Sequence, residues 1–178
     1  MKIAIIGAGN MGGAIARGLA LGQTIDTKDI YVSNPSQSKL DRLKEEFPDM
    51  NVTNDNQEAV TGADYIYLAV KPWLVKSVLR ALKLRKSQVL VSVAAAVTFE
   101  ELAHYVPDKD MAMFRIVPNT AIRICQSMTL IAERNTTDEQ HRTLTAMLDE
   151  MGKTIYIEEK QIAAATALCS CGIAYVMK

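Results

Sequence analysis

The chain has 178 residues, of which 49% are hydrophobic, so it is long enough to bury the core of one full domain and is not generally disordered. Its 20 Lys and Arg residues balance its 20 Asp and Glu residues, and a net charge of zero gives no bias toward nucleic acid. No apolar run reaches the roughly 18 residues that span a bilayer, and the short run before Gly7 is unlike a signal peptide. We therefore expect a cytoplasmic protein with neither a nucleic-acid nor a membrane partner.

Strand-like and helix-like patterns alternate over the first two thirds of the chain. Short runs that are apolar on both faces predict strands at residues 2–7, 30–33, around Val52, 65–70, 89–93 and 111–117. Helices are predicted between them at 11–21, 36–47, 57–61, 73–84 and 99–104, with Pro72 just before the fourth. This alternation predicts an α/β fold with a doubly wound, mainly parallel sheet that is covered on both faces.

The last third of the chain changes character. A strand at 127–132, an amphipathic helix at 138–151 and a strand at 154–157 are followed by residues 161–177, which include no charged residue. A helix of this composition is expected to be buried on every side. Because nothing follows to bury it, we expect a longer protein, a partner subunit, or both. The predicted boundary divides the chain into residues 1–158 and residues 159–178.

Three glycines at the spacing G-x-G-x-x-G separate the first predicted strand from the first helix. Gly7 permits a tight turn, Gly9 lets a pyrophosphate approach the backbone, and Gly12 lets the helix pack close to the strand. The N–H groups at the start of the helix then favour an anion. The pattern predicts a dinucleotide site of the Rossmann type, and the alternative is a tight strand–helix turn with no ligand.

The second predicted strand ends without the carboxylate that NAD-preferring proteins carry there. Hydroxyl, amide and ammonium donors take its place, from Ser33, Asn34, Ser36 and Lys39. Such donors suit the 2′-phosphate of NADP, so NADP is the predicted cofactor and NAD the alternative. An Asx turn followed by a helix cap explains the same residues equally well.

With the glycine motif GAGNMG at 7–12, four further motifs occur in order along the chain: AVKP at 69–72, SVAAAVT at 92–98, RIVPNTA at 115–121 and ATALCSCGIAY at 165–175. Together they resemble the Δ1-pyrroline-5-carboxylate reductase family over the whole chain. The resemblance implies a Rossmann-like NAD(P)-binding domain at 1–158, and at 159–178 the start of a helical domain that forms a homodimer or a higher homo-oligomer. It also implies reduction of a cyclic imine, 1-pyrroline-5-carboxylate, to L-proline with a hydride from NAD(P)H.

The same resemblance implies the positions of the site residues. The pyrophosphate is expected at Gly7, Ala8, Gly9, Asn10, Met11 and Gly12, and the adenosine half at Ser33, Asn34 and Asn56. The nicotinamide half is expected at Ala69, Val70, Lys71, Pro72, Ala94 and Ala95. Asn119 would lie near the reacting ring and is the nearest candidate for a catalytic residue. The groups that bind the substrate carboxylate and protonate its nitrogen would come largely from beyond residue 178.

The chain departs from the family pattern at several positions. Ala96 replaces a glycine, Ala121 replaces a proline, and Pro35 replaces the arginine that is common after the second strand. In the final motif, Ser170 replaces the usual first glycine, Cys171 the serine and Ile173 the proline. Two alternative functions therefore stay open: a β-hydroxyacid-type dehydrogenase, and a non-catalytic sensor of NAD(P).

The remaining chemically distinctive residues are assigned structural roles. Lys71 is equally well explained as a charged group near the nicotinamide and as a loop lysine. Three cysteines without a CxxC pair, and two histidines without ligand-spaced partners, predict neither a disulfide nor a metal site. Cys125, Cys169 and Cys171 are expected to be buried structural thiols. Trp73 and Tyr175 are expected to pack against the protein, with contact to a cofactor as the alternative for Trp73. Arg115 is expected in a surface salt bridge, with an anion as the alternative partner.

Overall fold

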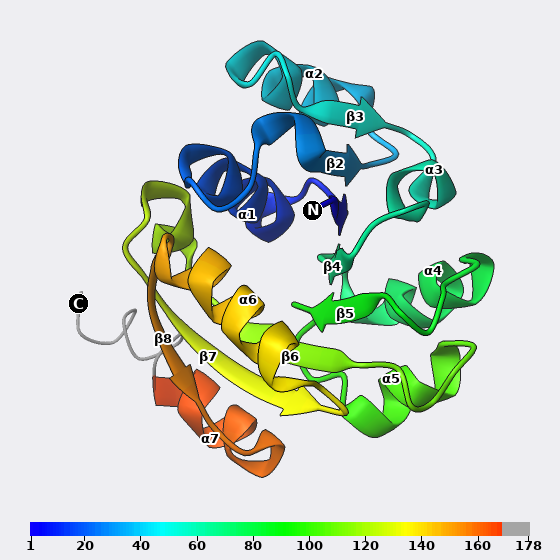
Figure 1. The fold of residues 1–178 in the computed structure, drawn as a ribbon, viewed down its shortest axis with the longest axis vertical. Helices are drawn as coiled ribbons and strands as arrows, with labels where there is room; N and C mark the ends of the chain where they lie inside the picture. The colour runs from blue at the N-terminus through cyan, green and yellow to red at the C-terminus, as the bar shows by residue number, and fades with distance from the viewer. Residues whose placement is uncertain (169–178) are drawn as a thin grey trace.

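The sheet runs through the whole molecule, with helices on both of its faces (Figure 1). The computed structural model describes residues 1–168, so Cys169, Cys171 and Tyr175 lie outside the described residues. Within the described part, eight strands are hydrogen-bonded in the order β3-β2-β1-β4-β5-β6-β7-β8. The predicted α/β class and mainly parallel sheet are confirmed.

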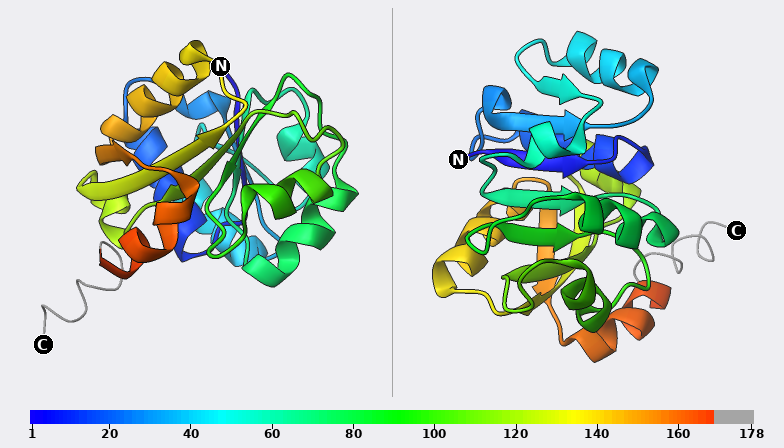
Figure 2. Two further views of the ribbon diagram at one scale, coloured as in Figure 1. Left: turned by 90° about the horizontal axis from the view of Figure 1, so that it is seen from below. Right: turned by 90° about the vertical axis from the view of Figure 1, so that its right-hand side faces the viewer.

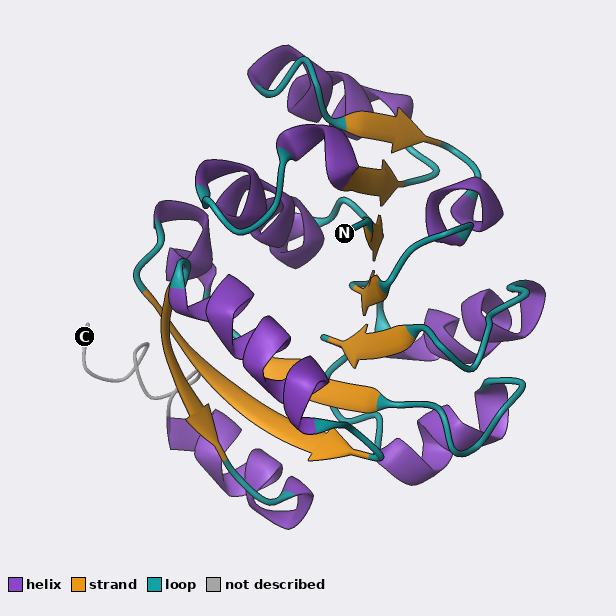
Figure 3. Ribbon diagram, viewed as in Figure 1, coloured by secondary structure: helices purple, strands orange, loops and turns teal. Residues whose placement is uncertain are grey.

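The elements follow the predicted order (Figure 3). The strands are β1 (Ile3–Ile6), β2 (Ile30–Ser33), β3 (Asn51–Thr53), β4 (Tyr65–Leu68), β5 (Val89–Ser92), β6 (Met113–Val117), β7 (Ser127–Arg134) and β8 (Gly152–Tyr156). The helices are α1 (Asn10–Leu21), α2 (Gln37–Glu46), α3 (Asn56–Val60), α4 (Val75–Ala81), α5 (Phe99–Tyr105), α6 (Asp138–Asp149) and α7 (Ile162–Thr166). Short 3₁₀ turns are η1 (Thr27–Asp29), η2 (Pro72–Leu74), η3 (Thr120–Ile124) and η4 (Glu159–Gln161).

Strand β1 pairs in parallel with β2 on one side and β4 on the other. The strand order therefore reverses at β1, and in open α/β sheets ligands bind at the carboxyl ends of the strands beside such a reversal. Strand β7 runs antiparallel to β6. The connection at 118–126 is shorter than the dozen or so residues that a parallel crossover needs, and so the chain turns back on itself.

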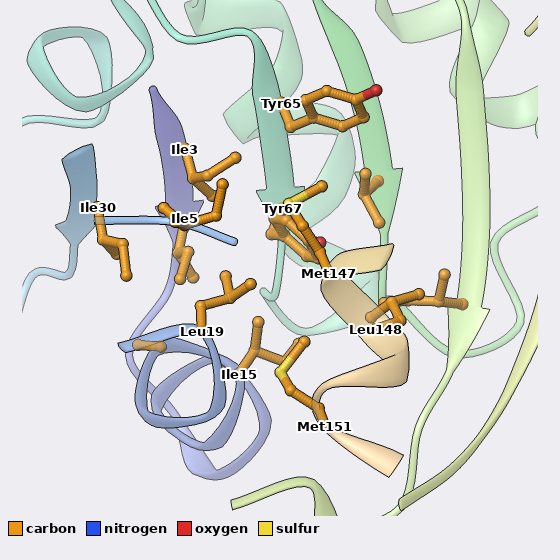
Figure 4. Close-up of a cluster of buried hydrophobic side chains, with 14 of the residues drawn as sticks. Ile3, Ile5, Ile15, Leu19, Ile30, Tyr65, Tyr67, Met147, Leu148 and Met151 are labelled. Atoms are coloured by element: carbon orange, nitrogen blue, oxygen red, sulfur yellow. The ribbon is translucent and has the colours of Figure 1, made fainter. Parts of the chain in front are cut away.

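Helices cover both faces of the sheet (Figure 2). The buried apolar side chains form two layers, one on each face of the sheet. One layer lies between the sheet and α1, α2 and α6, and Figure 4 shows Ile15 and Leu19 of α1 facing Tyr67 and Met147 in it. The other layer lies between the sheet and α3, α4 and α5. Two filled layers hold the strand ends, and the loops that follow them, in fixed positions.

Tyr67 is the largest fully buried side chain of the first layer. Its hydroxyl group has no hydrogen-bond partner within the described residues. Burial raises the pKa of this phenol far above its ordinary value, because the charged phenolate would lose its hydration.

The start of the predicted last helix is largely uncovered in the part that the structure describes. Helix α7 buries Ile162, whereas Ala163 and Ala164 are exposed and Leu168 is 76% exposed. That a further segment or a partner subunit covers this helix stays a prediction. None of the helices within residues 1–168 has the length and apolarity that a bilayer crossing requires.

Candidate functional site

The three glycines between β1 and α1 have three different surroundings. Gly7 has a φ of +100°, and a Cβ there would lie 2.6 Å from the carbonyl oxygen of Ala69. A Cβ on Gly12 would overlap the carbonyl oxygen of Gly7, whereas a Cβ on Gly9 would meet no atom within 4 Å. The fold therefore requires Gly7 and Gly12. Gly9 instead leaves free space above the backbone, which is what the close approach of a pyrophosphate needs.

Helix α1 begins directly after this open position. Gly9 is its N-cap, no side chain caps it, and its first turn carries no acidic residue. The first N–H groups of the helix and its dipole consequently favour an anion at Gly9 and Asn10. The arrangement is suited to phosphate groups.

The polar side chains at the end of β2 are engaged within the protein. Ser33 is fully buried and donates its hydroxyl hydrogen to Oδ1 of Asn56 at 2.7 Å. Oδ1 of Asn34 accepts the N–H of Ala8 at 3.0 Å, and its Nδ2 donates to the carbonyl oxygen of Ser36 at 3.3 Å. These bonds connect the loop at residues 7–9 (the glycine loop), the end of β2 and the start of α3, and so hold this edge of the sheet rigid.

The segment after β4 lies beside the glycine loop. The N–H of Ala69 donates to the carbonyl oxygen of Ile6 at 2.9 Å, Val70 is half-buried, and Lys71 is exposed. Pro72 starts the short turn η2, and the α-helix follows only at Val75, later than predicted. Trp73 is 75% exposed, so the predicted packing role of this indole is wrong within the described chain.

The turn between β5 and α5 contains a strained residue. Ala94 is buried, while Ala95 and Ala96 are exposed, and Ala96 has a φ of +60°. This left-handed conformation is unfavourable for alanine, and Ala96 is the position where the resemblance predicts glycine. Thr98 then caps α5 with Glu101 in a reciprocal pair, and the hydrogen bonds from Thr98 lower the pKa of the Glu101 carboxyl group.

Asn119 is half-buried at the end of β6 and caps η3. Its Oδ1 accepts the N–H of Ala121 at 3.0 Å, and its own N–H donates to Oγ of Ser127 at 3.2 Å. The side chain therefore shapes the loop after β6. A catalytic contribution from it stays a prediction.

Two cavities are lined by residues at the start of α1. The first, which we call the basic groove, has about 770 Å³ and lies between α1, α2 and η3, with Arg17, Lys39, Arg42 and Arg123 in its lining. The second, which we call the apolar cavity, has about 800 Å³ and is lined by the turn after β5, the end of β6 and the start of α7. Both volumes lie in the range of small-molecule sites. Asn10 lines the first cavity and the next residue, Met11, lines the second.

Arg115 lies on the wall of the apolar cavity, and its environment corrects the prediction of a surface salt bridge. Its side chain is only 8% exposed, and its Nη1 lies 2.6 Å from Oε1 of Glu159. The same Glu159 oxygen accepts the N–H of Phe99 at 2.7 Å. One carboxylate thus joins β6, the start of α5 and the start of the C-terminal segment. The sequence signal for a buried arginine at this position was a single charged residue inside the apolar run FRIV, because a buried charge requires a partner.

Of the predicted cofactor residues, some line the basic groove, some line the apolar cavity, and the others line neither. Ala8, Gly9 and Asn10 line the basic groove, and Met11, Ala94 and Ala95 line the apolar cavity. The other predicted positions line neither cavity and lie around the glycine loop, after β2, β4 and β6, or at the start of α3: Gly7, Gly12, Ser33, Asn34, Asn56, Ala69, Val70, Lys71, Pro72 and Asn119. Arg17, Arg42 and Arg123 are groove residues that the sequence did not single out.

The chemically reactive groups elsewhere are few in the described chain. Residues 1–168 contain no cluster of three His, Cys, Asp or Glu side chains that could hold a metal ion. Cys125 is half-buried in a left-handed conformation, not buried as expected. His141 stacks on Tyr156 and contacts Glu133, and His104 contacts the carbonyl oxygen of Glu100.

Comparison with known proteins assigns the class. Residues 2–96, more than half of the chain, match the family model described as NADP oxidoreductase coenzyme F420-dependent. The chain is 32% identical over 179 residues to pyrroline-5-carboxylate reductase 3 of Danio rerio, covering 99% of this chain and 61% of that protein. Within the broad class that the model describes, the chain belongs to the pyrroline-5-carboxylate reductase family, which confirms the predicted resemblance.

Solved structures agree with this family. The pyrroline-5-carboxylate reductase of Coxiella burnetii has a TM-score of 0.89 and 30% identity, covering 99% of this chain and 66% of the other. The pyrroline carboxylate reductase of Plasmodium falciparum, solved with NADP bound, has a TM-score of 0.88 and 26% identity, covering 99% and 65%. The chain thus spans just under two thirds of the length of these relatives.

Proposed function

We propose that this chain binds NADPH, or alternatively NADH, across the glycine loop. The supporting observation is that Asn10 and Met11, the first two residues of α1, line two different cavities. A dinucleotide has two halves joined by a pyrophosphate, and the free space at Gly9 accommodates the joining group. The nicotinamide half then lies in the apolar cavity and the adenosine half in the basic groove.

We further propose that the chain supplies the cofactor half of a reductase that converts 1-pyrroline-5-carboxylate to L-proline, a step of proline biosynthesis. The names of its relatives support this reaction. Bound NAD(P)H supplies the hydride. Met11, Ala94 and Pro118 line the apolar cavity and orient the nicotinamide ring in it. The same side chains keep water away from the hydride during its transfer.

Several finer predictions belong to the same proposal. Residues 1–158 form the cofactor domain, and residues 159–178 begin a helical domain through which the protein forms a homodimer or a higher homo-oligomer. The exposed apolar side chains of Ala163, Ala164 and Leu168 support a partner surface there. Asn119 is the candidate nearest to the reacting ring. A cytoplasmic location is expected for a biosynthetic enzyme of this kind.

Binding and chemistry are tested separately. The purified protein, in the length that its gene encodes, is titrated with NADPH and with NADH while its melting temperature is followed. Stabilisation by one or both nucleotides is expected, and an unchanged melting curve at millimolar concentration would contradict the proposed cofactor. The same protein is then mixed with pyrroline-5-carboxylate and NADPH, and the loss of nicotinamide absorbance is recorded. If the protein binds the nucleotide but no cyclic imine oxidises the bound NADPH, the protein is a sensor and not a reductase.

A further inference from the structure

Ser92 ends β5 in the wall of the apolar cavity, and its hydroxyl hydrogen is not donated to any group of the described protein. The residue is only 2% exposed. Its Oγ accepts the N–H of Ala94 over a long distance of 3.4 Å. Among residues 1–168, no oxygen or nitrogen atom accepts the hydroxyl hydrogen in return. Because buried hydroxyl groups normally donate their hydrogen, this group is available to an acceptor in the cavity.

The strand pairing places the Ser92 side chain on the face of the sheet that borders this cavity. Ser92 of β5 is in register with Arg115 of β6, and residues in register project from the same face of a parallel sheet. Leu90 and Met113, two residues earlier in each strand, belong to the apolar layer beneath α3, α4 and α5, and side chains two residues apart share a face. Arg115 also lines the cavity, so Ser92 lies beside it in the same wall.

Most other polar side chains of the cavity lining are already engaged within the protein. Their pairs are Arg115–Glu159, Thr98–Glu101 and Lys160–Glu158. Of the two that remain in the lining, Thr166 is half-buried and Ser92 is buried. A single neutral donor in an apolar wall suits a single neutral acceptor, because a carboxylate brought there would need several donors or a free cation.

We propose that the hydroxyl group of Ser92 donates a hydrogen bond to the carboxamide oxygen of the nicotinamide and so fixes the orientation of the ring in the apolar cavity. This inference rests on the proposed cofactor function. The carboxamide is the polar substituent of an otherwise apolar ring, so one bond to it determines which face of the ring is turned toward the substrate. Strand β5 is paired on both sides, which holds the donor in a fixed position.

The test measures dissociation constants by calorimetry for wild type and Ser92→Ala, in the length that the gene encodes. The ligands are NADPH, its thionicotinamide analogue, in which sulfur replaces the carboxamide oxygen, and 2′-phospho-ADP-ribose, which lacks the nicotinamide. Wild type should bind NADPH about three- to tenfold more tightly than the analogue, as expected for one neutral hydrogen bond. Ser92→Ala should weaken NADPH binding by about the same factor and bring the two constants within about twofold of each other. The constant for 2′-phospho-ADP-ribose should not change.

Two further measurements separate a contact with the cofactor from a role in folding. The melting temperature of free Ser92→Ala should not fall, since the hydroxyl hydrogen has no acceptor within residues 1–168. Ser77→Ala is the matched control, because it removes a serine hydroxyl from the exposed surface of α4, outside the lining of both cavities. This variant should change none of the three constants.

Each contrary outcome has a distinct meaning. Equal losses for all three ligands in Ser92→Ala, or a lower melting temperature of the free variant, would overturn the inference, because the serine would then support the fold of the site. A Ser92→Ala variant that binds NADPH as tightly as wild type, or that still discriminates against the thionicotinamide analogue, would overturn it as well. These results leave the proposed function intact. A wild type that binds none of the three ligands would refute the proposed function, and this inference with it.

Discussion

At the scale of single residues, the glycine loop separates the requirements of folding from those of binding. Gly7 and Gly12 have no room for a side chain, whereas the space at Gly9 is empty of protein atoms. The sequence pattern alone does not make this distinction, because the three positions belong to one motif. The distinction yields a paired prediction.

Gly9→Val should fold normally and lose nucleotide binding, because the new side chain occupies the place of the pyrophosphate. Gly12→Ala should lower the melting temperature of the free protein, since its Cβ would overlap the carbonyl oxygen of Gly7. Circular dichroism on heating, together with NADPH titration, measures both effects. Wild-type affinity in Gly9→Val would count against the placement of the pyrophosphate.

Ala96 stores backbone strain on the rim of the apolar cavity. Its φ of +60° costs an alanine about 1–2 kcal/mol, and glycine removes this cost while adding entropy to the unfolded chain. Ala96→Gly should therefore raise the free energy of unfolding by about 1 kcal/mol in urea denaturation. Ala95→Gly, next to it and without a positive φ, is the control and should lower that free energy. Equal effects of the two variants would show that the turn is not strained.

The buried phenol of Tyr67 predicts a pH dependence of stability. Its pKa in the folded protein is raised by burial, so the unfolded chain loses this proton first as the pH rises above about 10. The contribution of the protonated Tyr67 phenol to the free energy of unfolding is therefore fully present below pH 10. Above pH 10 it is lost progressively, so that the free energy of unfolding is lower by about 1.4 kcal/mol at pH 11. Tyr67→Phe should abolish this part of the alkaline loss. It should also gain about 1 kcal/mol at pH 7, because a buried hydroxyl without a partner is removed.

The comparison is made by chemical denaturation at pH 7 and pH 11. Tyr65 and Tyr156, whose pKa values burial also raises, contribute to the alkaline slope in both proteins. The difference between wild type and Tyr67→Phe therefore isolates Tyr67. Identical alkaline slopes in the two proteins would show that its hydroxyl reaches a partner or solvent.

At the scale of elements, the pair Arg115–Glu159 holds the C-terminal segment against the sheet. Glu159 precedes α7 and bonds to both β6 and the first N–H of α5, beside the apolar cavity. Because α7 itself buries Ile162 alone, this carboxylate is a main attachment of residues 159–166 to the domain. The pair should therefore contribute to stability more than a surface pair does.

Glu159→Ala should lower the free energy of unfolding by about 2–3 kcal/mol, because it leaves the guanidinium group of Arg115 buried without its partner. Lys160→Ala breaks the exposed pair with Glu158 and should change that free energy by less than about 0.5 kcal/mol. Equilibrium denaturation in urea compares the two variants. Equal losses would indicate that Arg115 finds another partner when Glu159 is removed.

At the scale of the whole molecule, the sequence predicts correctly those parts of the fold that a short stretch of consecutive residues determines. Strands such as Tyr65–Leu68 are apolar on both faces, and the glycines mark the loop after β1, so the parallel sheet and the turn into α1 follow from short patterns. The reversal at β7 and the pair between Arg115 and Glu159 depend on contacts between distant segments. The basic groove likewise combines residues of α1, α2 and η3, and no single stretch of sequence displays it.

The central claim is that one dinucleotide lies across Asn10 and Met11 with its two halves in two cavities. A crystal structure of the protein with NADPH tests it most directly. We expect the pyrophosphate at the N–H groups of the first turn of α1, above Gly9, and the nicotinamide in the cavity lined by Met11, Ala94 and Pro118. A nicotinamide ring bound outside that cavity, or a pyrophosphate away from Gly9, would contradict the account.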